Sequence, residues 1–211
     1  MIFYYRKEKR VFIHVPKTGG NTIQTSFIQE KITDDYKIKR MQNQDGCERF
    51  DLQGVETRRK HQAFSTYLRD HPSMRSLHVL TAVRKPFERL LSFYFAPFNH
   101  AKFDPITQKT FFPKSVVFDE EKFMRLIQKT KTAAEWLSSS NDQIILPDHL
   151  TTIKTENLEN DFKKHFPDIK LTRRLNVSPY RKEALVLSQS LELRKHVENS
   201  KHAIDLSLIH I

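Results

Sequence analysis

The chain has 211 residues, with 36 Lys and Arg against 25 Asp and Glu, and its net charge at pH 7 is +11. An aromatic fraction of 11% argues against a disordered chain, and the length suits one domain over residues 1–211 with a substantial core. The single Cys47 excludes a disulfide framework within the chain and a cysteine-rich zinc site, and no stretch approaches the ~18 apolar residues of a membrane span.

The start of the chain predicts a strand, a turn and a helix. Residues 11–15 (VFIHV) are mostly apolar and β-branched and end at Pro16, which is typical of a buried strand. Gly19 and Gly20 are two of only four glycines in the chain and predict a turn. Apolar residues at helical spacing over 23–28 predict the helix that follows the turn.

The middle of the chain predicts a second strand with its own helix. Residues 33–59 are polar and predict a long irregular connection, and residues 61–68 predict a short helix. Residues 78–83 (HVLTAV) predict a buried strand, and the apolar pattern of residues 87–95 predicts the next helix. Residues 99–114 contain two prolines and show no period, which predicts a loop.

The last part of the chain continues the alternation. We expect helices over residues 120–130, 156–166 and 181–200, a strand over residues 152–155, and a last strand over residues 203–211. Alternating short apolar strands and helices favour an α/β fold with a parallel sheet.

Polar residues follow the first predicted strand, where ligands bind in parallel α/β sheets. Gly19 and Gly20 permit close backbone approach, and the next helix offers unpaired N–H groups at its positive end. Lys17, Thr18 and Thr22 add a cation and two hydroxyls. Together they predict a cradle for a phosphate or a sulfate; an ordinary glycine turn beside a solvated lysine is the alternative.

The second predicted strand ends at Arg84, and Ser92 follows eight residues later. A guanidinium and a hydroxyl in this region can hold a second phosphate, although a surface arginine and a helix-packing serine fit the same spacing. A nucleotide kinase is disfavoured, because Lys17 precedes the glycines and no acidic residue stands at the end of the second strand to hold magnesium.

Four segments of the chain resemble one family. Residues 12–22 (FIHVPKTGGNT) look like the HxPKTGGT/S loop that holds the 5′-phosphosulfate in carbohydrate sulfotransferases. Residues 84–94 (RKPFERLLSFY) resemble the family's R-x-P-x-x-R-x-x-S-x-Y motif for the 3′-phosphate. Residues 153–162 are similar to R-x-E-N-L-x-x-D-F, with Lys154 at the arginine, and residues 175–178 match L-N-x-S.

The resemblance implies a P-loop-like sulfotransferase fold, with a central parallel sheet flanked by helices. It also implies transfer of a sulfuryl group from 3′-phosphoadenosine 5′-phosphosulfate (PAPS), without a metal, to a hydroxyl of a carbohydrate or other acceptor. The matching subtype is the Golgi-type heparan and chondroitin sulfotransferases, here as a soluble member of bacterial type. Arg84 and Ser92 would bind the 3′-phosphate, and the loop residues that would bind the rest of the donor are Pro16, Lys17, Thr18, Gly19, Gly20, Asn21 and Thr22. Asn21 stands where many members have Thr or Ser.

Two residues are predicted to be catalytic. Lys17 would stabilise charge on the bridging oxygen and the 5′-phosphate. His61 would be the base, because histidine titrates near neutrality and because the family has a catalytic histidine at the start of a short helix between the two motifs. His14 is the rival candidate for the base.

The charge of +11 and the pI near 9.7 permit an anionic partner without selecting one. A non-catalytic module that binds polyanions on the same fold is the alternative function. We expect no nucleic-acid partner, no integral membrane segment and a cytoplasmic protein, since the first strand begins about ten residues after Met1. The acceptor would contact residues 33–59 and 99–114, whose sequences do not identify it.

Overall fold

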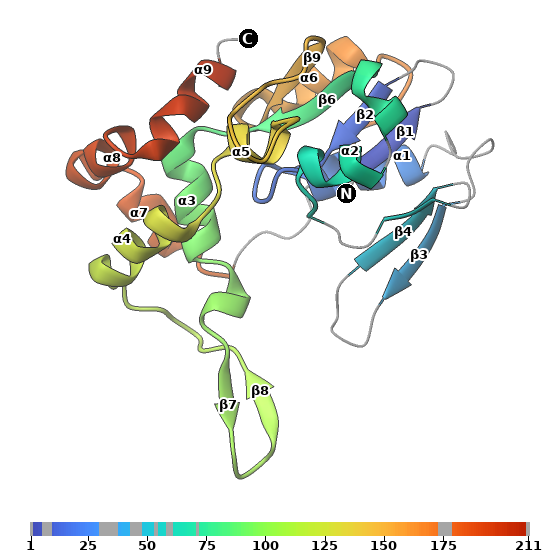
Figure 1. Ribbon diagram of the computed structural model, residues 1–211. Helices are drawn as coiled ribbons and strands as arrows, with labels where there is room; N and C mark the ends of the chain where they lie inside the picture. Colours follow the sequence, from blue (N-terminus) through green and yellow to red (C-terminus); the bar gives the residue numbers. More distant parts are fainter. Residues whose placement is uncertain are drawn as a thin grey trace.

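A four-stranded sheet of order β1-β2-β6-β9 lies at the centre of the computed structural model (Figure 1). The structure describes residues 2–5, 10–29, 38–42, 48–52, 55–57, 61–70, 72–172 and 179–209. The strands of the central sheet are β1 (Ile2–Tyr5), β2 (Arg10–Ile13), β6 (His78–Val83) and β9 (Leu150–Lys154).

The two inner pairings of the sheet are parallel. β2 pairs in parallel with β6, with Val11 opposite Val79, and β6 pairs in parallel with β9. This confirms the predicted parallel sheet and mixed α/β class. β1 was not predicted; it adds to β2 in the antiparallel direction at the edge of the sheet, which an alternation of strands and helices does not indicate.

Apolar clusters on both faces of the sheet explain why β2 and β6 read as mostly apolar runs. On one face, β2 and β6 pack against helices α1 (Gly20–Gln29) and α6 (Leu158–His165). On the other face lie α2 (Phe64–Asp70) and α5 (Ala133–Leu137), together with Leu208 from α9 (Asp205–Ile209).

Helix α3 (Pro86–Tyr94) continues from the end of β6 and forms the centre of a separate apolar cluster. It packs against α4 (Glu120–Lys129), α7 (Arg181–Leu187) and α8 (Leu191–Glu198), which lie around it in Figure 1. Short 3-10 segments complete the described chain: η1 (Pro72–Ser76), η2 (Pro97–Asn99), η3 (Thr155–Asn157) and η4 (Lys201–Ile204). Over the described ranges, every helix is too short or too polar to cross a bilayer.

Two helix predictions and one strand prediction need correction. Helix α2 begins at Phe64, so His61 lies in the segment before it. The single helix predicted over residues 181–200 is two helices, because the chain turns and Ser190 caps the second by accepting from the Leu193 amide. The predicted last strand is wrong, because residues 201–209 are helical and Leu208 is buried against the sheet.

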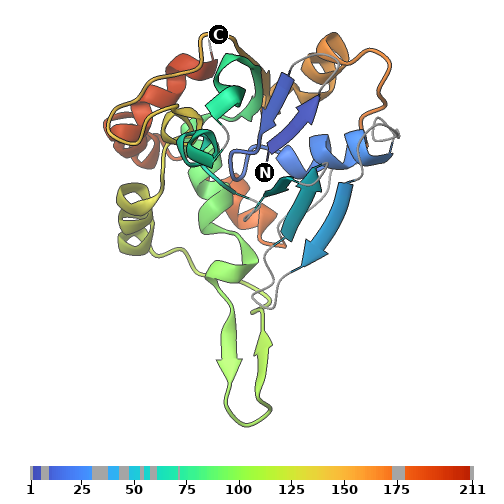
Figure 2. The same cartoon turned by 45° about the vertical axis from the view of Figure 1, so that its right-hand side comes forward.

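Two regions predicted to be irregular contain strands. Between α1 and α2 the backbone forms an antiparallel sheet of β3 (Ile38–Gln42), β4 (Glu48–Leu52) and β5 (Val55–Thr57). Between α3 and α4, β7 (Lys102–Asp104) and β8 (Lys109–Phe111) form a hairpin that projects from the body in both views (Figures 1 and 2). Backbone pairing builds these strands, and their polar sequences gave no hydrophobic period to detect.

Candidate active site

The loop between β2 and α1 is a tight turn with two left-handed residues. Lys17 has φ of 69° and Gly19 has φ of 78°. Thr18 closes the turn, since its Oγ1 donates to the Val15 carbonyl at 2.8 Å. The Thr22 amide donates to the Gly19 carbonyl at 3.0 Å, which starts α1. Because α1 begins at Gly20, the positive end of the helix lies next to Lys17.

Gly20 is the position where only glycine fits. A Cβ built on Gly20 would lie 2.2 Å from Cδ2 of His14, whose ring is buried. Gly19 has ordinary space around it, and its left-handed φ is the constraint there. The double glycine therefore meets two different physical demands.

We expect Gly20→Ala to lower the free energy of unfolding by about 1–3 kcal/mol, the usual range for overpacking a buried site. The cause would be the clash with the buried His14 ring. Urea unfolding measures the change, and the double variant Gly20→Ala with His14→Ala should lose less stability than the two single changes predict together. Simple additivity in this cycle would contradict the clash.

The ends of β2 and β6 bring two cations together. Burial, and to a lesser extent the positive charge of Arg84, lower the pKa of Lys17 below its ordinary value. Arg84 directly follows β6, just as the Lys17 loop follows β2. A partly buried pair of like charges is costly in the protein alone, and a bound anion would offset the cost. The pair therefore has the electrostatics of an anion site.

A hydrogen-bonded clamp after β9 holds these two loops. Thr155 Oγ1 lies 2.8 Å from the Thr18 carbonyl oxygen and 2.8 Å from that of Val83, and its one hydroxyl proton is donated to either oxygen or shared between them. The next side chain, Glu156, accepts from the Lys85 amide at 2.9 Å. Residues 153–162 resembled a family motif, but the sequence did not show that this segment fixes the spacing of the other two.

His61 lies against the same loop. Its Nδ1 is 3.4 Å from the His14 carbonyl oxygen, and the two imidazole rings meet edge to face with centroids 4.7 Å apart. A carbonyl only accepts, so the bond requires a proton on Nδ1 and leaves Nε2 as the basic nitrogen of the neutral ring. The Trp136 ring lies on another side, at 6.4 Å.

Among the predicted site residues, the described contacts bring three together at the loop after β2 but show no contact between them and Ser92. Lys17 and Arg84 interact through their charges, and His61 joins the loop through His14. Ser92 lies in the second turn of α3, half-buried, and its role stays a prediction from the sequence.

Arg89, the second arginine of residues 84–94, has a structural environment. It is buried at 1% exposure and donates through Nη2 to the Lys131 carbonyl at 2.8 Å and to Asp205 at 3.4 Å. Burial lowers the pKa of Arg89, and the Asp205 charge opposes that shift. Asp205 also accepts from the amides of Ala133 and Ala134, at 2.8 and 3.0 Å. This pair ties α3 to α5 and α9.

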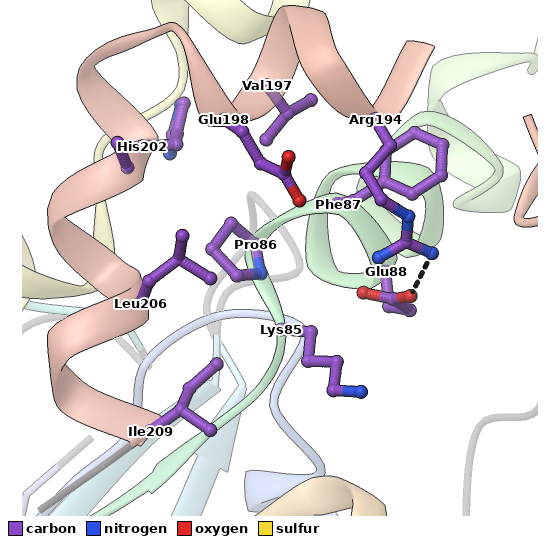
Figure 3. A pocket seen from close by; sticks show the side chains of 11 residues that line it. Lys85, Pro86, Phe87, Glu88, Arg194, Val197, Glu198, His202, Leu206 and Ile209 are labelled. Carbon is purple, nitrogen blue, oxygen red and sulfur yellow. Dashed lines mark hydrogen bonds and ion pairs between the residues drawn. The ribbon is translucent and has the colours of Figure 1, made fainter. Parts of the chain in front are cut away.

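A cavity of about 230 Å³ lies between the N-terminus of α3 and residues of α8 and α9 (Figure 3). Pro86 and Phe87 face Val197 and Leu206 across it, and Arg194 pairs with Glu88 at 3.0 Å on its rim. None of the predicted donor-binding or catalytic residues lines this cavity. Among the residues that the structure describes, no cluster of three or more His, Cys, Asp or Glu is arranged to hold a metal ion.

Comparison with known proteins finds one family model that matches most of the chain. A model of the sulfotransferase family matches residues 1–184. No curated protein and no solved structure gave a significant match. The match covers the loop after β2, the start of α3 and the clamp after β9, which are three of the four segments that carried the resemblance. The fourth, residues 175–178, also falls within the match but lies outside the described residues. The chain belongs to the sulfotransferase family.

Proposed function

We propose that the protein transfers the sulfuryl group of PAPS to a hydroxyl of a carbohydrate. The observation that carries this proposal is that two cations, Lys17 and Arg84, lie close enough to repel each other at the carboxyl ends of two adjacent parallel strands. Family membership supports sulfuryl transfer. PAPS is inferred as the donor because it carries two anionic groups, and each of the two strand ends offers a cation for one of them. The carbohydrate acceptor is inferred from the resemblance of the sequence motifs to those of carbohydrate sulfotransferases.

The donor would bind across the two strand ends. The loop from Pro16 to Thr22, which we propose to act as a P-loop-like phosphate cradle, would hold the 5′-phosphosulfate through its amides and the Lys17 ammonium. Arg84 and Ser92 would hold the 3′-phosphate, the group that ATP lacks. The clamp of Thr155 and Glu156 would keep the two halves of this site at the spacing of one nucleotide.

The chemical step needs a base and a stabilised leaving group. His61 Nε2 would take the proton of the acceptor hydroxyl as its oxygen attacks the sulfur. The bond between sulfur and the bridging oxygen breaks, and its electrons remain on the 5′-phosphate of adenosine 3′,5′-bisphosphate. Lys17 would neutralise that charge, at a position where partial burial strengthens the interaction. The products are a sulfate ester and a protonated imidazole, which returns its proton to water.

Incubation with sulfur-radiolabelled PAPS and a panel of glycans tests the transfer. Label on a glycan, lost in the Lys17→Ala variant, would support the proposal. Binding of glycans that needs no PAPS and moves no label would instead show a polyanion-binding module and would overturn it.

We expect adenosine 3′,5′-bisphosphate to stabilise the fold more than AMP, because only the former carries a 3′-phosphate. A ligand at about 100 times its dissociation constant adds about 2.7 kcal/mol to the free energy of unfolding. Thermal unfolding with each nucleotide at equal concentration measures the difference. In the Arg84→Ala variant the two nucleotides should give equal shifts; equal shifts in the wild type would remove Arg84 and Ser92 from the donor site.

A further inference from the structure

The β7–β8 hairpin exposes large apolar side chains far from the sheet. It projects beyond the end of α3 that is opposite to Arg84, and none of the other described helices and strands covers it in either view (Figures 1 and 2). Ile106 at its tip is 91% exposed and Phe103 is 65% exposed. Phe98, Phe111 and Phe112 are exposed as well, between 48% and 62%. Clustered exposure of this kind marks an interaction surface.

Both faces of this two-stranded ribbon carry phenyl rings. The register places Phe111 opposite Lys102 on one face and Phe103 opposite Thr110 on the other. Phe112 is the residue that follows β8, and it is exposed as well. A protein surface covers one face of such a ribbon, whereas the fluid interface of a lipid layer surrounds both faces and the tip. The placement of the rings therefore fits lipid better than a protein partner.

The charges on the hairpin select the kind of lipid. Lys102 and Lys109 are exposed on the strands, and Lys114 is exposed just beyond them. The one carboxylate, Asp104, serves the turn, since it accepts from the Ile106 amide at 2.9 Å and from Thr107 at 2.6 Å. Lysine stems lie along apolar surface while their ammonium groups reach the headgroups, and anionic headgroups attract them.

We propose that the β7–β8 hairpin docks the protein on anionic lipid surfaces. Ile106 and Phe103 enter the apolar part of the interface, and Lys102 and Lys109 contact the phosphate groups. A sulfated or acidic glycan would satisfy the lysines, but it offers no apolar interior for Ile106. The docking is peripheral, and it does not depend on the sulfuryl-transfer site.

Co-sedimentation of the full chain with vesicles tests the proposal. We expect binding to phosphatidylcholine vesicles that contain phosphatidylglycerol, and much weaker binding to pure phosphatidylcholine. Combining Phe103→Ser, Ile106→Ser and Phe112→Ser should weaken binding at least about tenfold, because the inserted apolar area is lost. The pair Lys102→Gln and Lys109→Gln should weaken it and reduce its dependence on salt.

Matched variants elsewhere on the surface separate this site from general stickiness. Leu185→Ser with Val186→Ser removes two comparably exposed apolar residues on α7, and Lys163→Gln with Lys164→Gln removes two exposed charges on α6. Both pairs should bind vesicles like the wild type. The hairpin variants should unfold at the wild-type temperature, since their side chains lie outside the three apolar clusters.

Three results would overturn the proposal. The first is no binding of the wild type to anionic vesicles, and the second is equal binding by the triple serine variant. The third is a hairpin-dependent contact of another class: a dimer in gel filtration, or heparin binding, that the triple serine variant loses while vesicle binding is unchanged. Transfer to a soluble acceptor is measured separately, so failure here leaves the sulfotransferase proposal standing.

Discussion

Replacing Lys17 by alanine is expected to reduce sulfuryl transfer by about 10²–10³-fold, the usual cost of removing a group that stabilises developing charge. The lysine is partly exposed and its burial already lowers its pKa, so its removal relieves a cost in the unliganded protein. The variant should therefore unfold at or slightly above the wild-type temperature. Initial rates with labelled PAPS measure the loss, and Lys163→Ala, on the exposed face of α6, is the matched control.

Replacing His61 by alanine is also expected to reduce sulfuryl transfer, and the pH dependence of the rate gives this variant a second measurement. A general base contributes about 10²–10⁴-fold, and only its unprotonated form acts. The wild-type rate should fall at acid pH as the imidazole binds a proton, and the residual rate of the variant should lack that limb. His196→Ala, on the exposed surface of α8, should retain the wild-type rate and pH profile.

The His61→Ala variant also distinguishes His61 from His14 as the base. His14 is buried, lies under Gly20 and presents its carbonyl oxygen to His61, which is the geometry of a residue that orients the base. If His61→Ala keeps both its rate and its acid limb, His61 is not the base and His14 takes that assignment. If Lys17→Ala keeps its rate, the leaving phosphate is neutralised elsewhere.

The strands that position the site were predictable because of where they lie. β2 and β6 are covered on both faces, so their residues are mostly apolar and form visible runs, whereas β9 (LTTIK) has only two apolar residues, Leu150 and Ile153. β7 and β8 are exposed on both faces, and β3 to β5 are short and polar in sequence. Their backbone pairing stabilises them without a hydrophobic period, and so no pattern predicted them.

The candidate site also has a part that the sequence predicts and a part that it does not. The Lys17 loop was predictable from local chemistry, since two of four glycines, a lysine and a helix start lie within a few residues. Thr155 contacts Thr18 across 137 positions of the chain, and Arg89 meets Asp205 across 116. Contacts at such separation depend on how the helices pack, and one sequence does not show which polar groups will meet.

Asp205→Ala is expected to have the largest effect on stability, a loss of about 3–5 kcal/mol. The change leaves the guanidinium of Arg89 buried without its carboxylate and leaves the amides of Ala133 and Ala134 without their acceptor. Within the described chain, Nε and Nη1 of Arg89 have no hydrogen-bond partner, so Asp205 provides much of the compensation for this charge. Urea unfolding measures the loss, and a variant that does not fold is the extreme of the same result.

A double variant keeps this prediction testable if the single one fails to fold. Arg89→Met with Asp205→Asn removes both charges and keeps a side-chain oxygen for one of the two α5 amides, so it should be more stable than Asp205→Ala. Glu121→Ala breaks an ion pair at a similar 3.3 Å whose side chains are 58% and 86% exposed, and it should not change stability measurably. Equal losses in Asp205→Ala and Glu121→Ala would contradict the structural role of the buried pair, because burial is what distinguishes the two sites.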